Sequence, residues 1–172
     1  GGVGKTTIAK AVYNSIAEQF DARCFLENVR ETFNPDKGGH VELQDKLHSK
    51  LFGDSRSFNV GSVGGINVIK RSVCSQRILL ILDDVNELLQ LKELAGDHNW
   101  FGPRSRIIIT TRDQHLLTYH KADSMYEVSR LDDNQAIQLF SWHAFKRDKP
   151  VESYVELTKC IIGYAKGLPL AL

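Results

Sequence analysis

The chain has 172 residues, of which 42% are hydrophobic and 25% are charged, a composition typical of a folded globular domain. This composition excludes a disordered, collagen-like or coiled-coil protein as the main interpretation. The 22 Lys and Arg residues nearly balance the 21 Asp and Glu residues, and the net charge of +1 predicts neither nucleic acid nor a membrane surface as a partner.

Three cysteines, Cys24, Cys74 and Cys160, are widely spaced and form no C-x-x-C pair. An odd number at such spacing favours buried thiols of a reducing compartment over disulfides or zinc ligands. The longest strongly apolar run, Ile78 to Leu82, is too short to cross a bilayer. We therefore expect no membrane span in this sequence.

Helical and strand patterns alternate in the first part of the chain. Apolar residues recur at helical spacing from Ile8 to Phe20, so a helix is expected there. The segments that follow are predicted, in order, as a strand at Cys24 to Leu26 with Val29, a loop at Thr32 to Gly39, a helix at Val41 to Phe52, a loop at Gly53 to Gly65 and a short helix at Ile66 to Cys74.

The alternation continues to the end of the chain. It predicts, in order, a strand at Ile78 to Leu82, a helix at Leu88 to Ala95, a turn at Gly96 to Ser105, a strand at Ile107 to Ile109, a helix at Gln114 to Tyr119, a strand at Met125 to Leu131 and helices at Asn134 to Phe145 and Val151 to Lys166. Asp132 or Asp133 can cap the first of the last two helices, and Gly167 with Pro169 ends the second. Such alternation predicts an α/β fold with a mostly parallel sheet and helices on both faces.

The opening sequence, Gly1 to Thr7, is the second half of a phosphate-binding loop of the form G-x-x-x-x-G-K-[ST]. Glycines let backbone amides approach phosphate oxygens, and the N-terminus of the following helix favours an anion. Lys5 adds a positive charge, and the Thr6 hydroxyl can bind Mg²⁺. The alternative is a glycine-rich turn that binds nothing. A strand should lead into this loop, so we expect the sheet to lack its first strand and to have a vacant central position.

Two further groups are expected at the same edge of the sheet. The apolar run ends in Asp83 and Asp84. Asp83 could hold Mg²⁺, and Asp84 could orient or deprotonate a water. The alternative is that both acids lie in a solvated turn. Arg112 follows the next strand and could bond to a γ-phosphate, the alternative being a surface ion pair with Asp113. The carboxyl ends of parallel strands form the ligand-binding edge of such folds, which is why these residues are candidates.

Six ordered motifs cover the chain: GGVGKTT at 1–7, FLENVRE at 25–31, LLILDDV at 79–85, SRIIITTRD at 105–113, LF with HAF at 139–145, and GLPLAL at 167–172. Together they resemble the NB-ARC nucleotide-binding region of plant disease-resistance proteins with leucine-rich repeats. The FLENVRE block, and Asn86 where the other subclass usually has tryptophan, resemble the subclass with an N-terminal TIR domain. Arg104 stands where relatives often have glycine.

The resemblance implies a P-loop NTPase-like three-layer fold in residues 1–131 and the start of the helical ARC subdomain in 132–172. It also implies an adenine nucleotide, ADP at rest and ATP when active, together with Mg²⁺. The implied nucleotide-binding residues are Gly2, Val3, Gly4, Lys5, Thr6, Thr7, Arg112 as γ-phosphate sensor and Pro169 near the adenine. The implied metal residues are Thr6 and Asp83, and Asp84 is the implied catalytic residue.

The implied function is a switch in plant immune signalling that is at most a slow ATPase and is located in the cytoplasm, with a nucleo-cytoplasmic location as an option. The implied partners are the TIR and leucine-rich-repeat domains of the same protein, with an oligomer as an option for the active state. The chain begins and ends inside motifs, so we expect an internal fragment that is marginally stable alone. The alternatives are a turnover P-loop ATPase or kinase of an unrelated pathway, and an interaction scaffold that binds no nucleotide.

Overall fold

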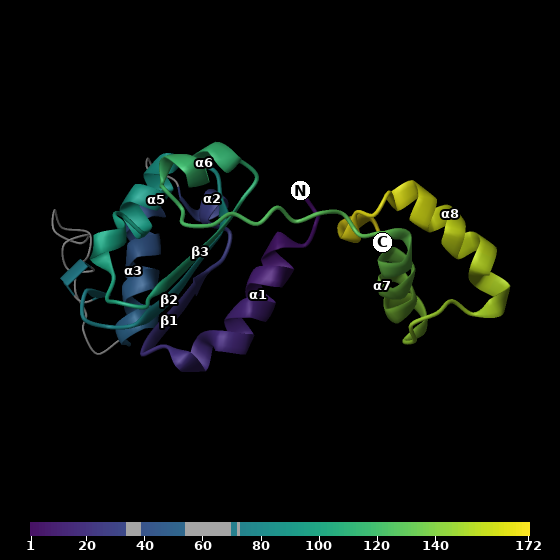
Figure 1. Ribbon diagram of the computed structural model, residues 1–172, viewed down its shortest axis with the longest axis horizontal. Coiled ribbons are helices and arrows are strands. Elements are labelled where there is room, and N and C mark those ends of the chain that lie inside the picture. The colour runs from purple at the N-terminus through teal and green to yellow at the C-terminus, as the bar shows by residue number, and fades with distance from the viewer. Residues whose placement is uncertain (34–38, 54–69, 72) are drawn as a thin grey trace. The chain divides into compact units, whose positions relative to one another are not determined.

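The computed structural model describes residues 1–33, 39–53, 70–71 and 73–172, which form two compact units (Figure 1). One unit comprises Thr6–Met125, and the other combines Gly1–Lys5 with Tyr126–Leu172. Three predicted segments lie mostly outside the described residues: the loops at 32–39 and 53–65 and the helix at 66–74.

The larger unit contains a three-stranded parallel sheet in the order β1-β2-β3. Its strands are β1 (Ala22–Leu26), β2 (Ile78–Val85) and β3 (Arg106–Thr111). β2 pairs directly with both neighbours, so the predicted vacant position does not lie between these three strands. Direct pairing satisfies the backbone groups of β2, whose apolar residues are completely or almost completely buried.

Helices cover both faces of this sheet, which gives the predicted three-layer α/β arrangement (Figure 1). On one face α1 (Lys5–Ile16) packs Ala9 and Tyr13 against Phe25 of β1 and Ile81 of β2. The alternate residues of β2 face the larger core cluster on the other side. The helices on that side are α2 (Val29–Thr32), α3 (Gly39–Phe52) and α5 (Leu88–Leu94).

The remaining elements follow the predicted order closely. They are η1 (Ala17–Gln19), η3 (His98–Trp100), α6 (Gln114–Tyr119), α7 (Asp133–Phe145), η4 (Glu152–Tyr154), α8 (Val155–Ala165) and η5 (Pro169–Ala171). Of the two predicted caps of α7, the structure uses Asp132, whose side chain accepts a hydrogen bond from the Gln135 N–H. None of the described helices is both long and apolar enough to cross a membrane.

Two predicted strand positions are wrong. Val29 begins α2 instead of extending β1, and the segment from Met125 to Leu131 forms no strand. Most of that segment is exposed, and the Leu131 N–H donates to the Gly167 carbonyl oxygen instead of to a neighbouring strand. A strand needs a partner along its length, so the residue pattern alone was insufficient.

All three cysteines are free, but the prediction that they are buried holds only for Cys24. Cys74 and Cys160 are exposed, because Cys74 lies in a turn and Cys160 on an outward position of α8. Burial in the core raises the pKa of the Cys24 thiol to about 12, with a smaller opposing effect of Lys50. Cys24 is therefore a protonated core residue at neutral pH.

In the smaller unit, the backbone of Gly167, just after α8, lies close to the backbone of Leu131, just before α7. Gly167 has φ +71°, and a Cβ added to it would lie 2.2 Å from the carbonyl oxygen of Leu131. Only glycine fits at this point without displacing backbone. Gly163, inside α8, has open space at the same position.

We expect Gly167→Ala to lower the free energy of unfolding of this unit by about 2 kcal/mol or more, because the alanine is strained at positive φ and meets backbone. Gly163→Ala is the matched control and should raise stability by roughly 0.5–1 kcal/mol, since alanine favours a helix interior. Urea denaturation of both variants measures the difference. Equal stabilities would contradict the described turn.

Candidate functional site

The centre of the candidate site is Asp83, which lies at the carboxyl end of β2 and has 1% of its surface exposed. The Thr6 hydroxyl, at the start of α1, donates to its two carboxylate oxygens at 2.9 and 3.0 Å. The Thr110 hydroxyl of β3 donates to the same carboxylate at 2.6 Å. Side chains from two other elements, α1 and β3, therefore converge on one buried carboxylate of β2.

This oxygen set fits Mg²⁺, which prefers hard oxygen ligands. Adjacent ligands of an octahedral Mg²⁺, each at about 2.0–2.1 Å, lie about 3 Å apart, and this is the spacing of the Thr6 and Asp83 oxygens. Both hydroxyl partners of Asp83 are neutral, and no basic side chain among the described residues of Thr6–Met125 forms an ion pair with it. A buried carboxylate in such surroundings is stabilised by a cation.

The described residues contain no cluster of three or more His, Cys, Asp and Glu side chains that could hold a metal. A cation at Asp83 would therefore need further ligands from water or from a bound molecule. Mg²⁺ commonly binds in this way, through one or two protein groups together with waters and phosphates.

Asp84 has a different environment although it follows Asp83 directly. Its backbone is left-handed, with φ +57°, and its N–H donates to the Thr110 hydroxyl at 2.9 Å. Between Leu82 and Val85 the β2 strand has one residue more than β3 in the paired register, which is a β-bulge. The bulge changes the direction of the strand at Asp84.

Two arginines neutralise Asp84. Nη2 of Arg30, from α2, lies 2.9 Å from one carboxylate oxygen, and Nε of Arg112, directly after β3, lies 3.6 Å from the other. The alternative ion pair of Arg112 with Asp113 is not present in the described structure. Asp113 instead caps α6 by accepting the His115 N–H at 2.9 Å.

The glycine-rich residues before α1 belong to the smaller unit. Gly2 and Gly4 have φ values of +81° and +94°, conformations that L-residues with side chains rarely adopt. The Gly2 carbonyl accepts the Leu170 N–H at 3.2 Å, so the first residues contact η5, the turn that starts with Pro169. Lys5 is the first residue of α1.

Sequence reasoning missed two residues of this constellation. The sequence assigns no role to Thr110, although its hydroxyl bridges Asp83 and the backbone of Asp84. Arg30 was noted only within the FLENVRE block. For Thr110, a polar residue after three consecutive isoleucines was an available signal. For Arg30 no local signal existed.

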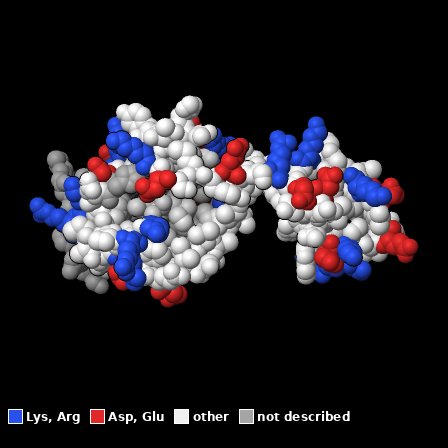
Figure 2. All heavy atoms as spheres, in the orientation of Figure 1, with Lys and Arg blue, Asp and Glu red and all other residues white. Residues whose placement is uncertain are grey.

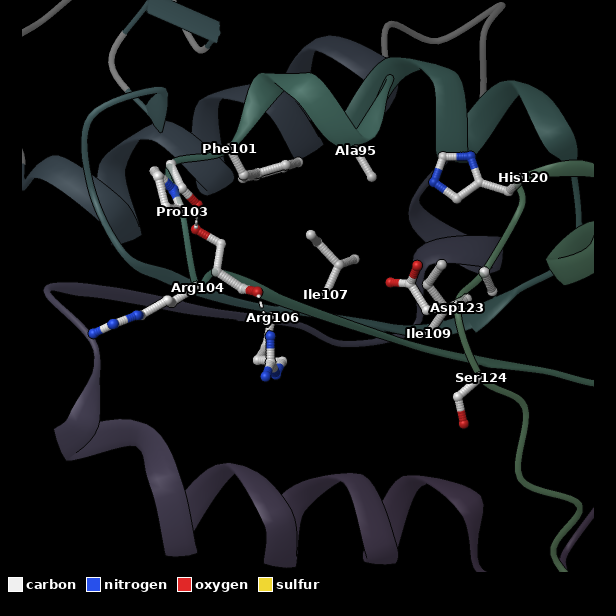
Figure 3. Close-up of a pocket in the computed structure, with 13 residues that line it drawn as sticks. Ala95, Phe101, Pro103, Arg104, Arg106, Ile107, Ile109, His120, Asp123 and Ser124 are labelled. Carbon is white, nitrogen blue, oxygen red and sulfur yellow. Dashed lines mark hydrogen bonds between the residues drawn. The ribbon is translucent and has the colours of Figure 1, made fainter.

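A separate cavity of about 660 Å³ borders β3 and contains none of the predicted site residues (Figure 3). Ile107 of β3 points toward Ala95 and Phe101 in this view. Arg104, which lines this cavity, has φ +66°, a conformation that glycine adopts more readily than residues with side chains. The turn before β3 is therefore formed despite the arginine side chain.

The charged surface is mixed in sign. In the view of Figure 2, Lys and Arg side chains alternate with Asp and Glu side chains over the described parts of each unit. This face has no continuous basic surface of the kind that binds the phosphate backbone of nucleic acids.

Comparison with known proteins identifies the family. The NB-ARC domain profile matches residues 1–150. The chain is 44% identical over 173 residues to Disease resistance protein RPV1 of Vitis rotundifolia and 44% identical over 179 residues to TMV resistance protein N of Nicotiana glutinosa. Each alignment covers 100% of this chain but only 12% and 15%, respectively, of the length of those relatives.

A third relative, Disease resistance protein RUN1 of Vitis rotundifolia, is 42% identical over 173 residues, which are all of this chain and 13% of that protein. The parallel α/β sheet, the phosphate-loop sequence and the match over most of the chain agree with one another. The chain therefore belongs to the NB-ARC domain family, a family of P-loop NTPase-like nucleotide-binding domains.

Proposed function

We propose that this domain is an ADP/ATP-operated switch in a plant immune receptor, with slow ATP hydrolysis returning it to the resting state. The observation that carries the proposal is the contact of the Thr6 hydroxyl with the Asp83 carboxylate, across 77 residues of sequence. A threonine hydroxyl at the start of the first helix, in contact with a buried strand-end acid, is suited to hold the metal ion of a metal-bound polyphosphate.

Each proposed role follows from the chemistry of the residue. The backbone amides of the loop and the Lys5 ammonium would bind phosphate oxygens, the proposed loop residues being Gly2, Val3, Gly4, Lys5, Thr6 and Thr7. Thr6 and Asp83 would hold Mg²⁺, which when bound neutralises phosphate charge. Pro169 would pack near the adenine.

Asp84 and Arg112 would respond to the third phosphate. The Arg112 guanidinium, 55% exposed, can move from Asp84 to a phosphate, since both are oxyanions. Asp84 would then orient a water or accept its proton. The two residues together link the phosphate content of the bound nucleotide to the conformation of β2 and β3.

The receptor context rests on the relatives, which are named disease resistance proteins. We propose TIR and leucine-rich-repeat domains in the same protein, a cytoplasmic location and an oligomer as an option for the active state. Within the chain, residues 1–131 would form the nucleotide-binding domain and 132–172 the start of the ARC subdomain. A switch also requires that ADP and ATP favour different conformations, because equal affinity shifts no equilibrium.

Steady-state hydrolysis by the complete receptor separates a switch from a turnover enzyme. We expect about 10⁻⁴–10⁻² s⁻¹, as for unassisted P-loop switches, whereas kinases work at about 1–100 s⁻¹. Acid release and mass identification of co-purified nucleotide test binding itself. A rate in the faster range would favour the kinase or ATPase alternative, and the absence of any bound or binding nucleotide would favour the scaffold.

We expect Lys5→Ala in the complete receptor to weaken ADP binding about tenfold or more, because one or two charged hydrogen bonds are lost. Lys10→Ala is the matched control. Lys10 lies in the same helix but forms an exposed ion pair with Glu27 at 3.2 Å, so its loss should leave ADP affinity unchanged. Isothermal calorimetry measures both. Unchanged affinity in Lys5→Ala would remove Lys5 from the site.

We expect Asp83→Asn to abolish the dependence of ATP binding on Mg²⁺, because the amide carries no charge for the cation. The measurement is a Mg²⁺ titration at fixed ATP, monitored by nucleotide binding. Asp45→Asn, at an exposed position of α3, is the control and should titrate like the wild type. A normal Mg²⁺ response in Asp83→Asn would place the metal elsewhere.

A further inference from the structure

Arg30 is anchored next to Asp84 by the core of the larger unit. Val29, the residue before it, is completely buried in the main core cluster. The N–H groups of Glu31 and Thr32 both donate to the Asn28 carbonyl oxygen, at 3.1 Å each, which closes the short helix α2. This turn places the Arg30 guanidinium on the Asp84 carboxylate at 2.9 Å.

Arg30 holds Asp84 more closely than Arg112 does. Its ion pair is shorter, 2.9 Å against 3.6 Å, and its side chain is less exposed, 36% against 55%. Arg30 also lies 4.0 Å from the carboxylate of Glu31, a largely exposed group that competes weakly for it. Arg30 is therefore the more permanent of the two cations on Asp84.

This difference matters if Arg112 leaves Asp84 to bind a γ-phosphate. The Asp84 carboxylate would then lie near the γ-phosphate, a second anion, and would have one cation fewer to neutralise it. Two neighbouring negative charges repel each other strongly in a partly buried site. Arg30 would be the remaining cation on the carboxylate. Without Arg30, Asp84 would repel the phosphate and would also retain Arg112 more strongly.

We propose that Arg30 determines the nucleotide specificity of this site by neutralising Asp84, so that the site accepts the third phosphate of ATP. The inference rests on the proposed nucleotide-binding function. Arg30 acts through Asp84 and is a positioning and charge-balancing residue. Its loss should therefore affect ATP, which has a γ-phosphate, and leave ADP, which has none, nearly unaffected.

The test is equilibrium binding of ADP and of a non-hydrolysable ATP analogue, each with Mg²⁺, to the complete receptor. Arg30→Gln should weaken binding of the ATP analogue about tenfold and change ADP binding by less than about twofold. Arg30→Lys, which keeps the charge, should retain most of the ATP preference. The control is Arg23→Gln, which removes an ion pair of similar length, 3.0 Å to Glu18, on β1 of the same unit.

A double-mutant cycle with Asp84→Asn distinguishes this role from direct contact with phosphate. In the Asp84→Asn background the carboxylate charge is absent, so Arg30→Gln should no longer weaken binding of the ATP analogue. An undiminished effect in that background would overturn the proposal, because Arg30 would then act on the nucleotide itself. Equal losses for ADP and the ATP analogue, or no loss, would also overturn it.

The same measurements separate this inference from the proposed function. If the wild-type receptor binds neither nucleotide, the proposed function fails and the inference fails with it. If the wild type binds both nucleotides and Arg30→Gln behaves like Arg23→Gln, the inference alone fails. Far-ultraviolet circular dichroism of each variant excludes misfolding as the cause of a lost affinity.

Discussion

The buried carboxylate of Asp83 is the constraint on which the site depends. Taking a carboxylate out of water is unfavourable unless donors replace the lost hydration. Thr6 and Thr110 supply those donors from α1 and β3. The same three hydrogen-bonded groups therefore fix the start of the first helix against the sheet. One arrangement therefore both stabilises the buried carboxylate and forms the candidate metal site.

The burial of β2 explains why the acid lies there. Ile78 to Leu82 are completely buried because helices cover both faces and strands pair on both sides. A polar residue within that run would have no solvent, so the first position for a carboxylate is the end of the strand. The parallel neighbours also end there. The hydroxyl of Thr110 is therefore available to Asp83, and guanidinium groups that follow the neighbouring strands are available to Asp84.

Much of this arrangement could be predicted from sequence, and the limits have physical causes. Continuous apolar runs identified β2 and β3, and helical spacing with a capping residue identified α7. The pairing of β2 with β3, and the absence of a strand at 125–131, depend on which strand edges meet in the fold. A local sequence pattern does not contain that information. Likewise Arg30 reaches Asp84 only through the fold, whereas the acid itself follows from the run before it.

Because of the bulge after Leu82, the neighbouring acids Asp83 and Asp84 lie in different electrostatic environments. Asp83 is surrounded by neutral hydroxyls, whereas Asp84 already has two guanidinium groups. A divalent cation that approaches this edge therefore gains most at Asp83, since at Asp84 it would meet positive charge already in place. An anion, in contrast, is attracted by the arginines on Asp84. In the proposed function, this separation of charge along two consecutive residues would place a metal and a phosphate side by side. Thr110, which is hydrogen-bonded to both residues, would maintain that order.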